Sequence, residues 1–441
     1  MHRSSLFPPL FLLPSMLLAQ VTPDQSQILQ RLERLEQQNR MLIEEVRELR
    51  QQIAATRPQQ QVPSLEERVD VQEKRTEEQA QTKVEASQKF PLSITGMAVF
   101  NAFITGRNNN GIDNPTVAAV NAGPATSSAT FRQSMVGLKY EGPQAWGATI
   151  RGSLLMDFFA GSSASLNHLL RLRIANISMD WKNQSLSVGQ DKPLISFRDP
   201  SSLAQLGVSA FTSAGNLWLW QPQVRFEQRA SLGTNTGLRA QVSVYQTSET
   251  STDVPTEFAA SLERSRPALQ GRFELWRQFE NGGRIEIAPG FHTSTTHVAA
   301  TSVPSRLFTV DWSIQPLVKW KLTGLFFTGE NSANMGSLRQ GFTVLGPRSV
   351  IPVHGSGGWA QLSYSPTNRL TFNLTNGQQD DRNVDLRSGG IGKNLQYASN
   401  LRYQLAPNVF LGFEASQIRT TYLGIGKRLN NHYDLALAYL F

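Results

Sequence analysis

The feature that most constrains the fold of this chain is an alternation of apolar and polar residues that starts at Phe90. The two faces of the segment AWGATIRGSLLMDFF (145–159) carry Trp146, Ala148, Ile150, Leu154, Met156 and Phe158 on one side, and Thr149, Arg151, Ser153 and Asp157 on the other. The same period of two recurs around Leu172, Val242 and Phe372. Such strands form either a soluble sandwich with its apolar face inward or a membrane barrel with its apolar face outward.

The spacing of the connections favours the barrel. Short turn-like joins occur at 142–145, 182–184, 231–237, 280–283, 315–316, 365–368 and 406–407. Long polar stretches alternate with them at 105–130, 160–168, 193–218, 247–266, 295–304, 330–357, 378–394 and 419–430. Seven turns and eight loops join sixteen strands of about ten residues, the length that crosses a bilayer at a tilt. A soluble sandwich has no reason to keep all its long loops at one edge, so the sequence predicts a sixteen-stranded antiparallel up-and-down transmembrane barrel over 90–441.

The last strand supports this prediction independently. Its alternating apolar face consists of Tyr433, Leu435, Leu437, Tyr439 and the terminal Phe441. This pattern resembles the C-terminal signal that the barrel-assembly machinery recognises in bacterial outer-membrane proteins. The aromatic residues expected in the interfacial girdles of such a barrel are Trp146, Trp181, Trp312, Trp320, Trp359 and Tyr439.

The first 19 residues have the character of a secretory signal peptide. Arg3 precedes an apolar run from Leu6 to Leu18, and Ala19 suits a cleavage site. The alternative is a buried apolar N-terminus, which three prolines in the run disfavour. Export places the function outside the cytoplasm.

An apolar repeat spaced alternately by four and three residues follows in segment 20–56. Its positions are Ile28, Leu32, Leu35, Asn39, Leu42, Val46, Leu49 and Ile53. This spacing predicts a coiled coil in which Asn39 fixes the register and Glu45 pairs with Arg50 of another chain. One amphipathic helix packed on its own domain is the alternative, and the β-branched residues at position a lean towards two strands. Residues 57–89 are interpreted as a polar spacer, partly helical.

Charge and cysteine content narrow the class of protein further. The chain has no cysteine, which excludes disulfides, a thiol nucleophile and Cys-based metal sites. Residues 1–89 hold 12 of the 42 Lys and Arg and 13 of the 34 Asp and Glu, so 90–441 carries 30 against 21, a net charge of +9. The basic surplus therefore belongs to the barrel and does not indicate nucleic-acid binding.

Taken together, the leader, the coiled coil and the strand pattern resemble the DcaP-like trimeric porins. The local likeness lies in MVGLKYEGPQAWGATIRGSLLMDFFAG and LLRLRIANISMDWKNQSLSVGQDK, in particular Asp157–Phe159, Arg171 with Arg173, and Gly189–Gln190. The resemblance implies a homotrimer in the outer membrane of a Gram-negative-type cell and a coiled coil in the periplasm. It also implies passive diffusion of small anionic solutes such as dicarboxylates. The lean towards two strands in the coiled coil fits this inference poorly.

The residues expected to line the channel are Arg151, Asp157, Arg171, Arg173, Lys192, Arg198, Arg225 and Arg239. Five of these arginines face inward by parity with their apolar neighbours, and a guanidinium suits carboxylate or phosphate. The alternative is that the arginines pair with Asp157, Glu227 or Glu274 as structural ladders, and the sequence leaves both open. The third long loop is the candidate to fold inward and narrow the lumen.

Enzymatic interpretations find little support, and no cofactor or metal is expected. Histidines 2, 168, 292, 297, 354 and 432 are expected in loops or at strand ends, without a recurring acid partner. The rival to a channel is a barrel whose coiled coil tethers the outer membrane to peptidoglycan, with conduction incidental.

Overall fold

The computed structural model describes residues 34, 37, 38, 40–45, 47, 48, 91–161, 168–249 and 254–441. The chain divides into two units, Met1–Lys89 and Phe90–Phe441. Of the predicted coiled-coil positions, only Leu42 is described, and it is helical and exposed. The other seven, the leader and the spacer lie outside the described residues, so the coiled coil stays a prediction. No helix among the described residues is long and apolar enough to cross a membrane.

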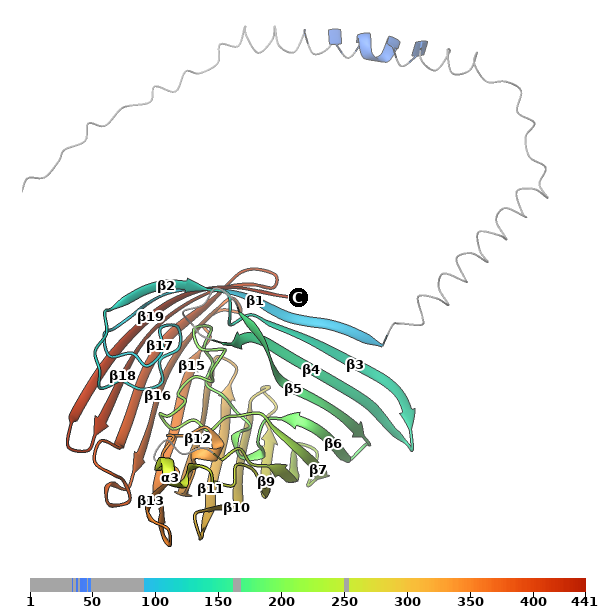
Figure 1. The fold of residues 1–441 in the computed structure, drawn as a ribbon. Helices are drawn as coiled ribbons and strands as arrows, with labels where there is room; N and C mark the ends of the chain where they lie inside the picture. The colour runs from blue at the N-terminus through green and yellow to red at the C-terminus, as the bar shows by residue number, and fades with distance from the viewer. Residues whose placement is uncertain are drawn as a thin grey trace, which may run out of the picture. The chain divides into compact units, whose positions relative to one another are not determined.

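The second unit consists almost entirely of strands (Figure 1). They are β1 (Leu92–Thr105), β2 (Thr126–Thr130), β3 (Met135–Ala145), β4 (Ala148–Ala160), β5 (Leu169–Asp180), β6 (Gln184–Asp191), β7 (Gln221–Ser231), β8 (Thr236–Gln246), β9 (Pro267–Gln278), β10 (Arg284–Val298), β11 (Thr301–Leu317), β12 (Trp320–Glu330), β13 (Phe342–Gly346), β14 (Ser349–Pro352), β15 (His354–Tyr364), β16 (Leu370–Asp381), β17 (Ile391–Ala406), β18 (Val409–Tyr422) and β19 (Gly426–Leu440). The short helices are η1 (Leu194–Ser196), α3 (Thr256–Ala259), η2 (Ala333–Met335) and η3 (Asn383–Asp385).

These strands, apart from the β13–β14 hairpin, form one seventeen-stranded antiparallel sheet that closes on itself. Closure comes from the pairing of β1 with β19, which runs from Met97↔Leu440 to Thr105↔His432. On its other side, β1 pairs with β3 along its first half and with β2 along its second half. Since β2 and β3 together fill one position, the barrel has sixteen strand positions, which confirms the predicted strand number.

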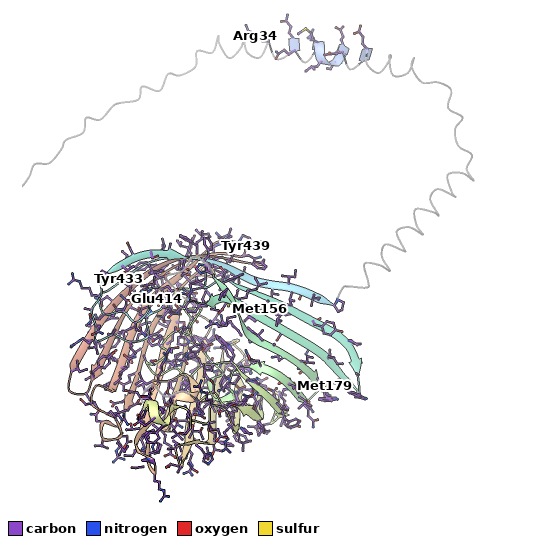
Figure 2. The ribbon with its side chains drawn as sticks, in the orientation of Figure 1. Arg34, Met156, Met179, Glu414, Tyr433 and Tyr439 are labelled. Carbon is purple, nitrogen blue, oxygen red and sulfur yellow. The ribbon has the colours of Figure 1, made fainter. Side chains whose placement is uncertain are left out.

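The alternation along the strands places apolar side chains on the outside of the barrel and polar ones inside. The outward residues Tyr433, Leu435, Leu437 and Tyr439 of β19 and the terminal Phe441 that follows it are 45–51% exposed, and Tyr433 and Tyr439 are labelled in Figure 2. Their inward neighbours Asp434, Ala436 and Ala438 are 2% exposed or less. An outward apolar face suits lipid, whereas a sandwich would bury it.

The strands alternate between two kinds of connection. At the short-turn end, two to five residues join successive strands, as between β3 and β4, where Trp146 and Gly147 both have positive φ and make a tight hairpin turn. At the long-loop end the connections are numbered in chain order, and four of them are used below: L1 (106–134, with β2), L3 (192–220), L6 (331–353) and L7 (382–390).

Four predicted connections are wrong in place or length. Gly142 and Pro143 form an irregularity inside β3, and the turn follows at Trp146–Gly147. The stretches 295–304 and 419–430 are not long loops, because β10 continues to Val298 and β18 to Tyr422, leaving connections of two and three residues. Their Thr, His and Asn side chains belong to polar strand ends, which resemble loops by composition alone. The turn predicted at 315–316 lies instead at 318–319.

Candidate functional site

The interior of the barrel is crossed by L3, which starts at Lys192 after β6 (Figure 1, green). Its backbone bonds to strands far apart in the sheet: Leu194 N donates to Gln270 Oε1 of β9 at 2.8 Å, and Ser201 N donates to Gln361 Oε1 of β15 at 2.7 Å. On another side, Asn101 Nδ2 of β1 donates to the carbonyl of Leu203 at 2.9 Å. A loop that bonds to β9, β15 and β1 of a closed barrel must run across its lumen.

The second half of L3 lies directly against the wall formed by β15 and β16. Gly215 has φ +100°, and a Cβ there would lie 2.1 Å from the carbonyl oxygen of Gly358, so the close approach needs glycine. Trp359 Nε1 donates to Asn216 Oδ1 at 3.0 Å, and Asn394 Nδ2 donates to the carbonyl of Ser213 at 2.8 Å. Trp359 therefore points inward and anchors the loop, and its predicted place in an interfacial girdle is wrong.

One group of predicted residues, Asp157, Arg171 and Arg173, lies together where β4 and β5 face L3. Arg171 donates to both oxygens of the fully buried Asp157, from Nε at 3.1 Å and from Nη2 at 2.6 Å. Arg173 Nη1 is 3.5 Å from Asp157 Oδ2 and donates to the carbonyl of Leu206 at 3.1 Å. Both guanidiniums also lie over the ring of Trp220, at 5.1 and 4.5 Å. This cluster fixes L3 to the wall and holds two cations against one carboxylate.

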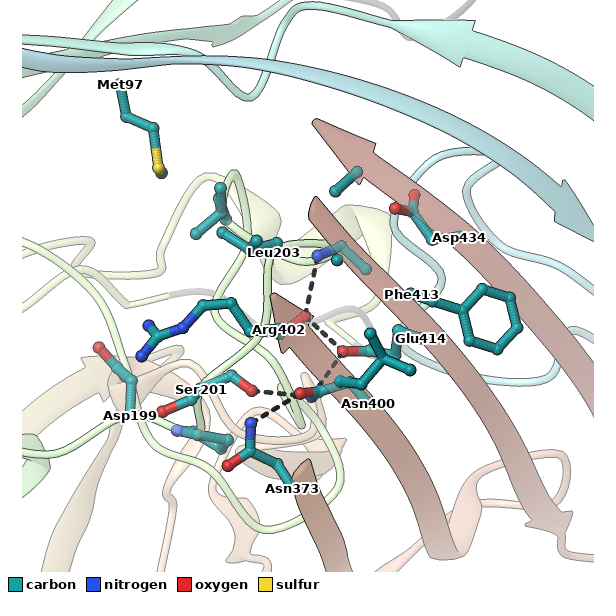
Figure 3. A pocket seen from close by; sticks show the side chains of 17 residues that line it. Met97, Asp199, Ser201, Leu203, Asn373, Asn400, Arg402, Phe413, Glu414 and Asp434 are labelled. Carbon is teal, nitrogen blue, oxygen red and sulfur yellow. Dashed lines mark hydrogen bonds between the residues drawn. The ribbon is translucent and has the colours of Figure 1, made fainter. Parts of the chain in front are cut away.

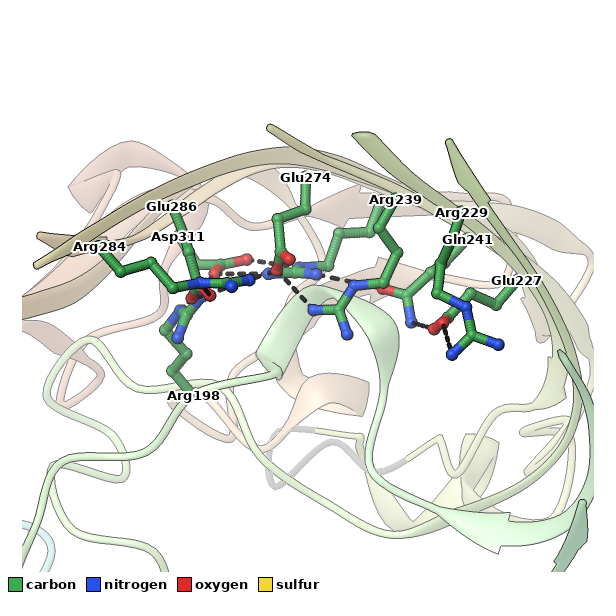
Figure 4. A network of polar contacts seen from close by, with 10 residues as sticks. Arg198, Glu227, Arg229, Arg239, Gln241, Glu274, Arg284, Glu286 and Asp311 are labelled. Carbon is green, nitrogen blue, oxygen red and sulfur yellow. Dashed lines mark hydrogen bonds and ion pairs between the residues drawn. The ribbon is translucent and has the colours of Figure 1, made fainter. Parts of the chain in front are cut away.

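A second group forms a ladder of charges across β8 to β11 (Figure 4). Arg198 of L3 donates from Nε to Asp311 Oδ1 at 2.8 Å and from Nη2 to Glu286. The ladder also includes Arg239 with Glu274 at 2.5 Å, Arg272 with Glu274 at 2.8 Å and with Asp311 at 2.7 Å, and Arg284 with Glu286 at 2.5 Å. It contains four guanidiniums and three carboxylates, so it too has one positive charge in surplus.

The other predicted residues make separate pairs. Arg151, half-exposed near the short-turn end, bonds to Asp180 at 3.0 Å. Arg225 lies 3.7 Å from Asp191 and donates from Nη2 to the carbonyl of Lys192 at 2.5 Å. Lys192 itself pairs with Asp199 within L3. Of the partners that the alternative named, Asp157 pairs with Arg171 and Arg173, and Glu274 pairs with Arg239, whereas Arg151 and Arg225 pair with other carboxylates.

Between L3 and the wall of β16 to β19 lies a cavity of about 330 Å³ (Figure 3). Ser202 Oγ donates to Glu414 Oε2 at 2.6 Å, and Asn400 Nδ2 donates to the same oxygen at 3.1 Å. Arg402 and Asp434 also line this cavity. The wall side of the cavity thus contributes the polar side chains of Asn373, Asn400, Arg402, Glu414 and Asp434.

Several residues of the candidate site carry no individual signal in the sequence, chiefly Arg272, Glu286 and Asp311. Arg272 and Glu274 stand two apart in one strand, as do Arg284 and Glu286, which places each pair on one face. Opposite charges at that spacing on an inward face were the available signal for a ladder. No sequence signal indicated Asp311 as the residue that joins Arg198 to Arg272.

Two of the histidines lie inside strands, whereas His297 and His354 lie at strand ends as expected, with 43% and 48% of their side chains exposed. His292 is buried in β10, where Nδ1 bonds to Tyr245 Oη at 2.6 Å, and His432 is buried in β19. His297 Nδ1 is 2.9 Å from Glu263, and His354 Nδ1 is 2.9 Å from Asp385. Among the described residues, no group of three His, Cys, Asp or Glu could hold a metal ion.

Two carboxyls in the loops at the long-loop end are buried. Burial raises the pKa of Glu249, in the connection after β8, although the hydrogen bond that Asn334 Nδ2 donates to it at 3.1 Å acts in the opposite direction. Burial likewise raises the pKa of Asp113 in L1, with Arg132 Nη1 3.4 Å away as the opposing charge. Each carboxyl therefore binds a proton more readily in the folded protein, and its contribution to stability falls as the pH rises.

No family model matches the chain, and no curated protein does either. Solved structures do match. The outer membrane channel DcaP of Acinetobacter baumannii superposes with a TM-score of 0.68 at 19% identity, covering 79% of this chain and 97% of that one. An anion-selective porin from Comamonas acidovorans gives 0.53 at 11% identity, over 79% and 99% of the two chains. OprB of Pseudomonas putida gives 0.51 at 10% identity, over 82% and 96%. At these identities the likeness shows the fold: residues 90–441 form a porin-like barrel.

Proposed function

We propose that this protein is an outer-membrane porin through which small hydrophilic solutes diffuse passively, with a preference for anions such as dicarboxylates. The observation that carries the proposal is the closed sixteen-stranded barrel with an outward apolar face, a polar inner face and L3 across its lumen. A barrel of this size encloses an aqueous space, and residues at its narrowest level select the solute.

The preference for anions rests on the charge left over after pairing. The Asp157 cluster and the ladder each hold one more guanidinium than carboxylate, and both lie against L3. Arg171 and Arg239 keep 26% and 23% of their side chains exposed. The two interpretations of the arginines are therefore compatible: they pair structurally, and each of these two groups still carries one surplus positive charge.

The test is the reversal potential of the full chain in a planar bilayer separating unequal KCl concentrations. A reversal potential of the sign set by chloride supports the proposal, and preference for potassium contradicts it. Replacing Arg171 and Arg173 by Ala lowers the anion preference if they line the path. Unchanged selectivity removes both residues from the lining set.

The proposed assembly is a homotrimer of exported chains in the outer membrane. Residues 1–19 direct export, the last strand is recognised by the barrel-assembly machinery, and three chains associate through the barrel and the coiled coil in the periplasm. Native mass spectrometry of the full chain and of a variant lacking 20–89 tests this assembly. Trimers that persist without 20–89 assign association to the barrel, and monomers in both contradict the trimer.

A further inference from the structure

At the long-loop end, a second cavity of about 440 Å³ lies where L1, L3, L6 and L7 meet. Its lining includes Ser213 of L3, Arg339 and Gln340 of L6, Arg387 of L7 and Thr116 of L1. It therefore lies on the side of L3 that faces away from the short turns.

The charged residues that line this cavity are all basic. Arg339 and Arg387 line it, and among the described residues that do so none is Asp or Glu. Arg339 is exposed, and Arg387 is half-buried and donates from Nη2 to the carbonyl of Val344. This differs from the lumen, where each predicted arginine lies beside a carboxylate. Two arginines that line one cavity, with no Asp or Glu among its described lining residues, attract anions.

The loops that carry the two arginines are held together by a reciprocal pair of hydrogen bonds. Gln340 Nε2 donates to the carbonyl of Ile391 at 3.0 Å, and Ile391 N donates to Gln340 Oε1 at 2.7 Å. On the opposite side, Asn110 Oδ1 accepts from the backbone N–H groups of Thr116 and Val117 at 2.9 and 3.2 Å. The cavity is thus formed before a ligand enters, which lowers the entropic cost of binding.

We propose that this cavity is an anion-binding site at the outer mouth of the channel, where Arg339 and Arg387 hold the carboxylate or phosphate group of a solute before it passes L3. The inference rests on the proposed porin function and adds a specific binding site on the path of the solute. A site at the mouth raises the local concentration of anions at the entrance, and so it increases flux at low solute concentration.

The experiment uses single channels of the full chain in KCl, with succinate or inorganic phosphate added to each side of the bilayer in turn. If the site exists, the added solute should interrupt the current, and the interruptions should be more frequent when the solute is added on the long-loop side. The double variant Arg339→Gln, Arg387→Gln lowers the apparent affinity roughly tenfold for a solute that binds there. Arg348→Gln is the matched control, because Arg348 lies on the same loop L6 but does not line the cavity.

The outcomes separate this inference from the porin function. Loss of interruptions by either solute in the double variant, with Arg348→Gln unchanged, supports the site and identifies the anion class. Equal interruptions in the double variant and the wild type, or none in a conducting wild type, overturn the site and leave the porin function standing. A wild type that does not conduct overturns the porin function itself. The single variant Arg339→Gln keeps the Arg387 contact with Val344, and so it reports on the site without disturbing L6.

Discussion

Replacing Asp157 by Asn should lower the stability of the barrel and raise its anion preference at the same time. Asp157 is fully buried and accepts two charge-assisted hydrogen bonds from Arg171, with Arg173 3.5 Å away. Asparagine keeps the shape and one acceptor but loses the charge, so about one charged hydrogen bond and the attraction of two cations are lost. This corresponds to about 3 kcal/mol in the free energy of unfolding.

The same substitution that lowers the stability should raise the preference of the channel for anions. The cluster changes from a net charge of +1 to +2, because its two guanidiniums remain. One added charge about 8 Å from a permeating ion in water is worth roughly 0.5 kcal/mol before screening, and about half of that in 0.1 M salt. Since the added charge attracts anions and repels cations, the ratio of their permeabilities should rise about twofold.

Two measurements check this pair of effects: urea-induced unfolding in lipid vesicles and the reversal potential in a bilayer. The matched control is Asp380→Asn, since Asp380 is half-exposed on the outward face of β16, where it pairs with Lys393 at 3.1 Å. The control should change the free energy of unfolding by less than about 1 kcal/mol and leave selectivity unchanged. A folded Asp157→Asn channel with unchanged or lower anion preference would refute the placement of this cluster on the ion path.

Three further predictions concern how L3 and the outer loops are held. Arg198→Met should cost about 3 kcal/mol in urea unfolding, because it breaks a buried contact between L3 and the ladder; a loss below about 1 kcal/mol contradicts this role. Gly215→Ala should increase current noise and destabilise the protein by several kcal/mol, roughly, because its Cβ would lie 2.1 Å from the Gly358 oxygen; unchanged noise and stability argue against the close contact. Glu249→Gln should stabilise the protein at pH values above the ordinary pKa of a glutamate and flatten its pH dependence, because the buried carboxyl has a raised pKa and glutamine can still accept from Asn334; a pH profile identical to the wild type's rules this out.

The outward face of the barrel could be predicted from local pattern because lipid and strand geometry together impose it. Leu172, Val242 and Phe372 are exposed on the outer surface, as their alternation with polar residues indicates. The strand ends were harder to place, because lipid no longer constrains the pattern there. Thr295 and Thr296 belong to β10 although their composition is that of a loop.

The arginines show the same limit inside the barrel. The alternation of side chains along a strand is sufficient to predict that Arg171 and Arg239 face inward, but it does not predict which residues they contact. Arg171 meets Asp157 on the neighbouring strand, whereas Arg198 reaches Asp311, which is 113 residues away in the chain. Whether an inward arginine is free or paired depends on such distant contacts.

The sequence by itself determined the number of strand positions, the outward apolar face and the basic surplus of the barrel, because each follows from residue type and a period of two. The path of L3 was decided only by the tertiary structure. Its course depends on Gln270, Gln361 and Asn101, which come from strands far apart in the chain and meet only when the sheet closes. The cavity that Arg339 and Arg387 line also depends on tertiary contacts, because L6 and L7 leave neighbouring parts of the sheet and are joined there by the hydrogen bonds between Gln340 and Ile391.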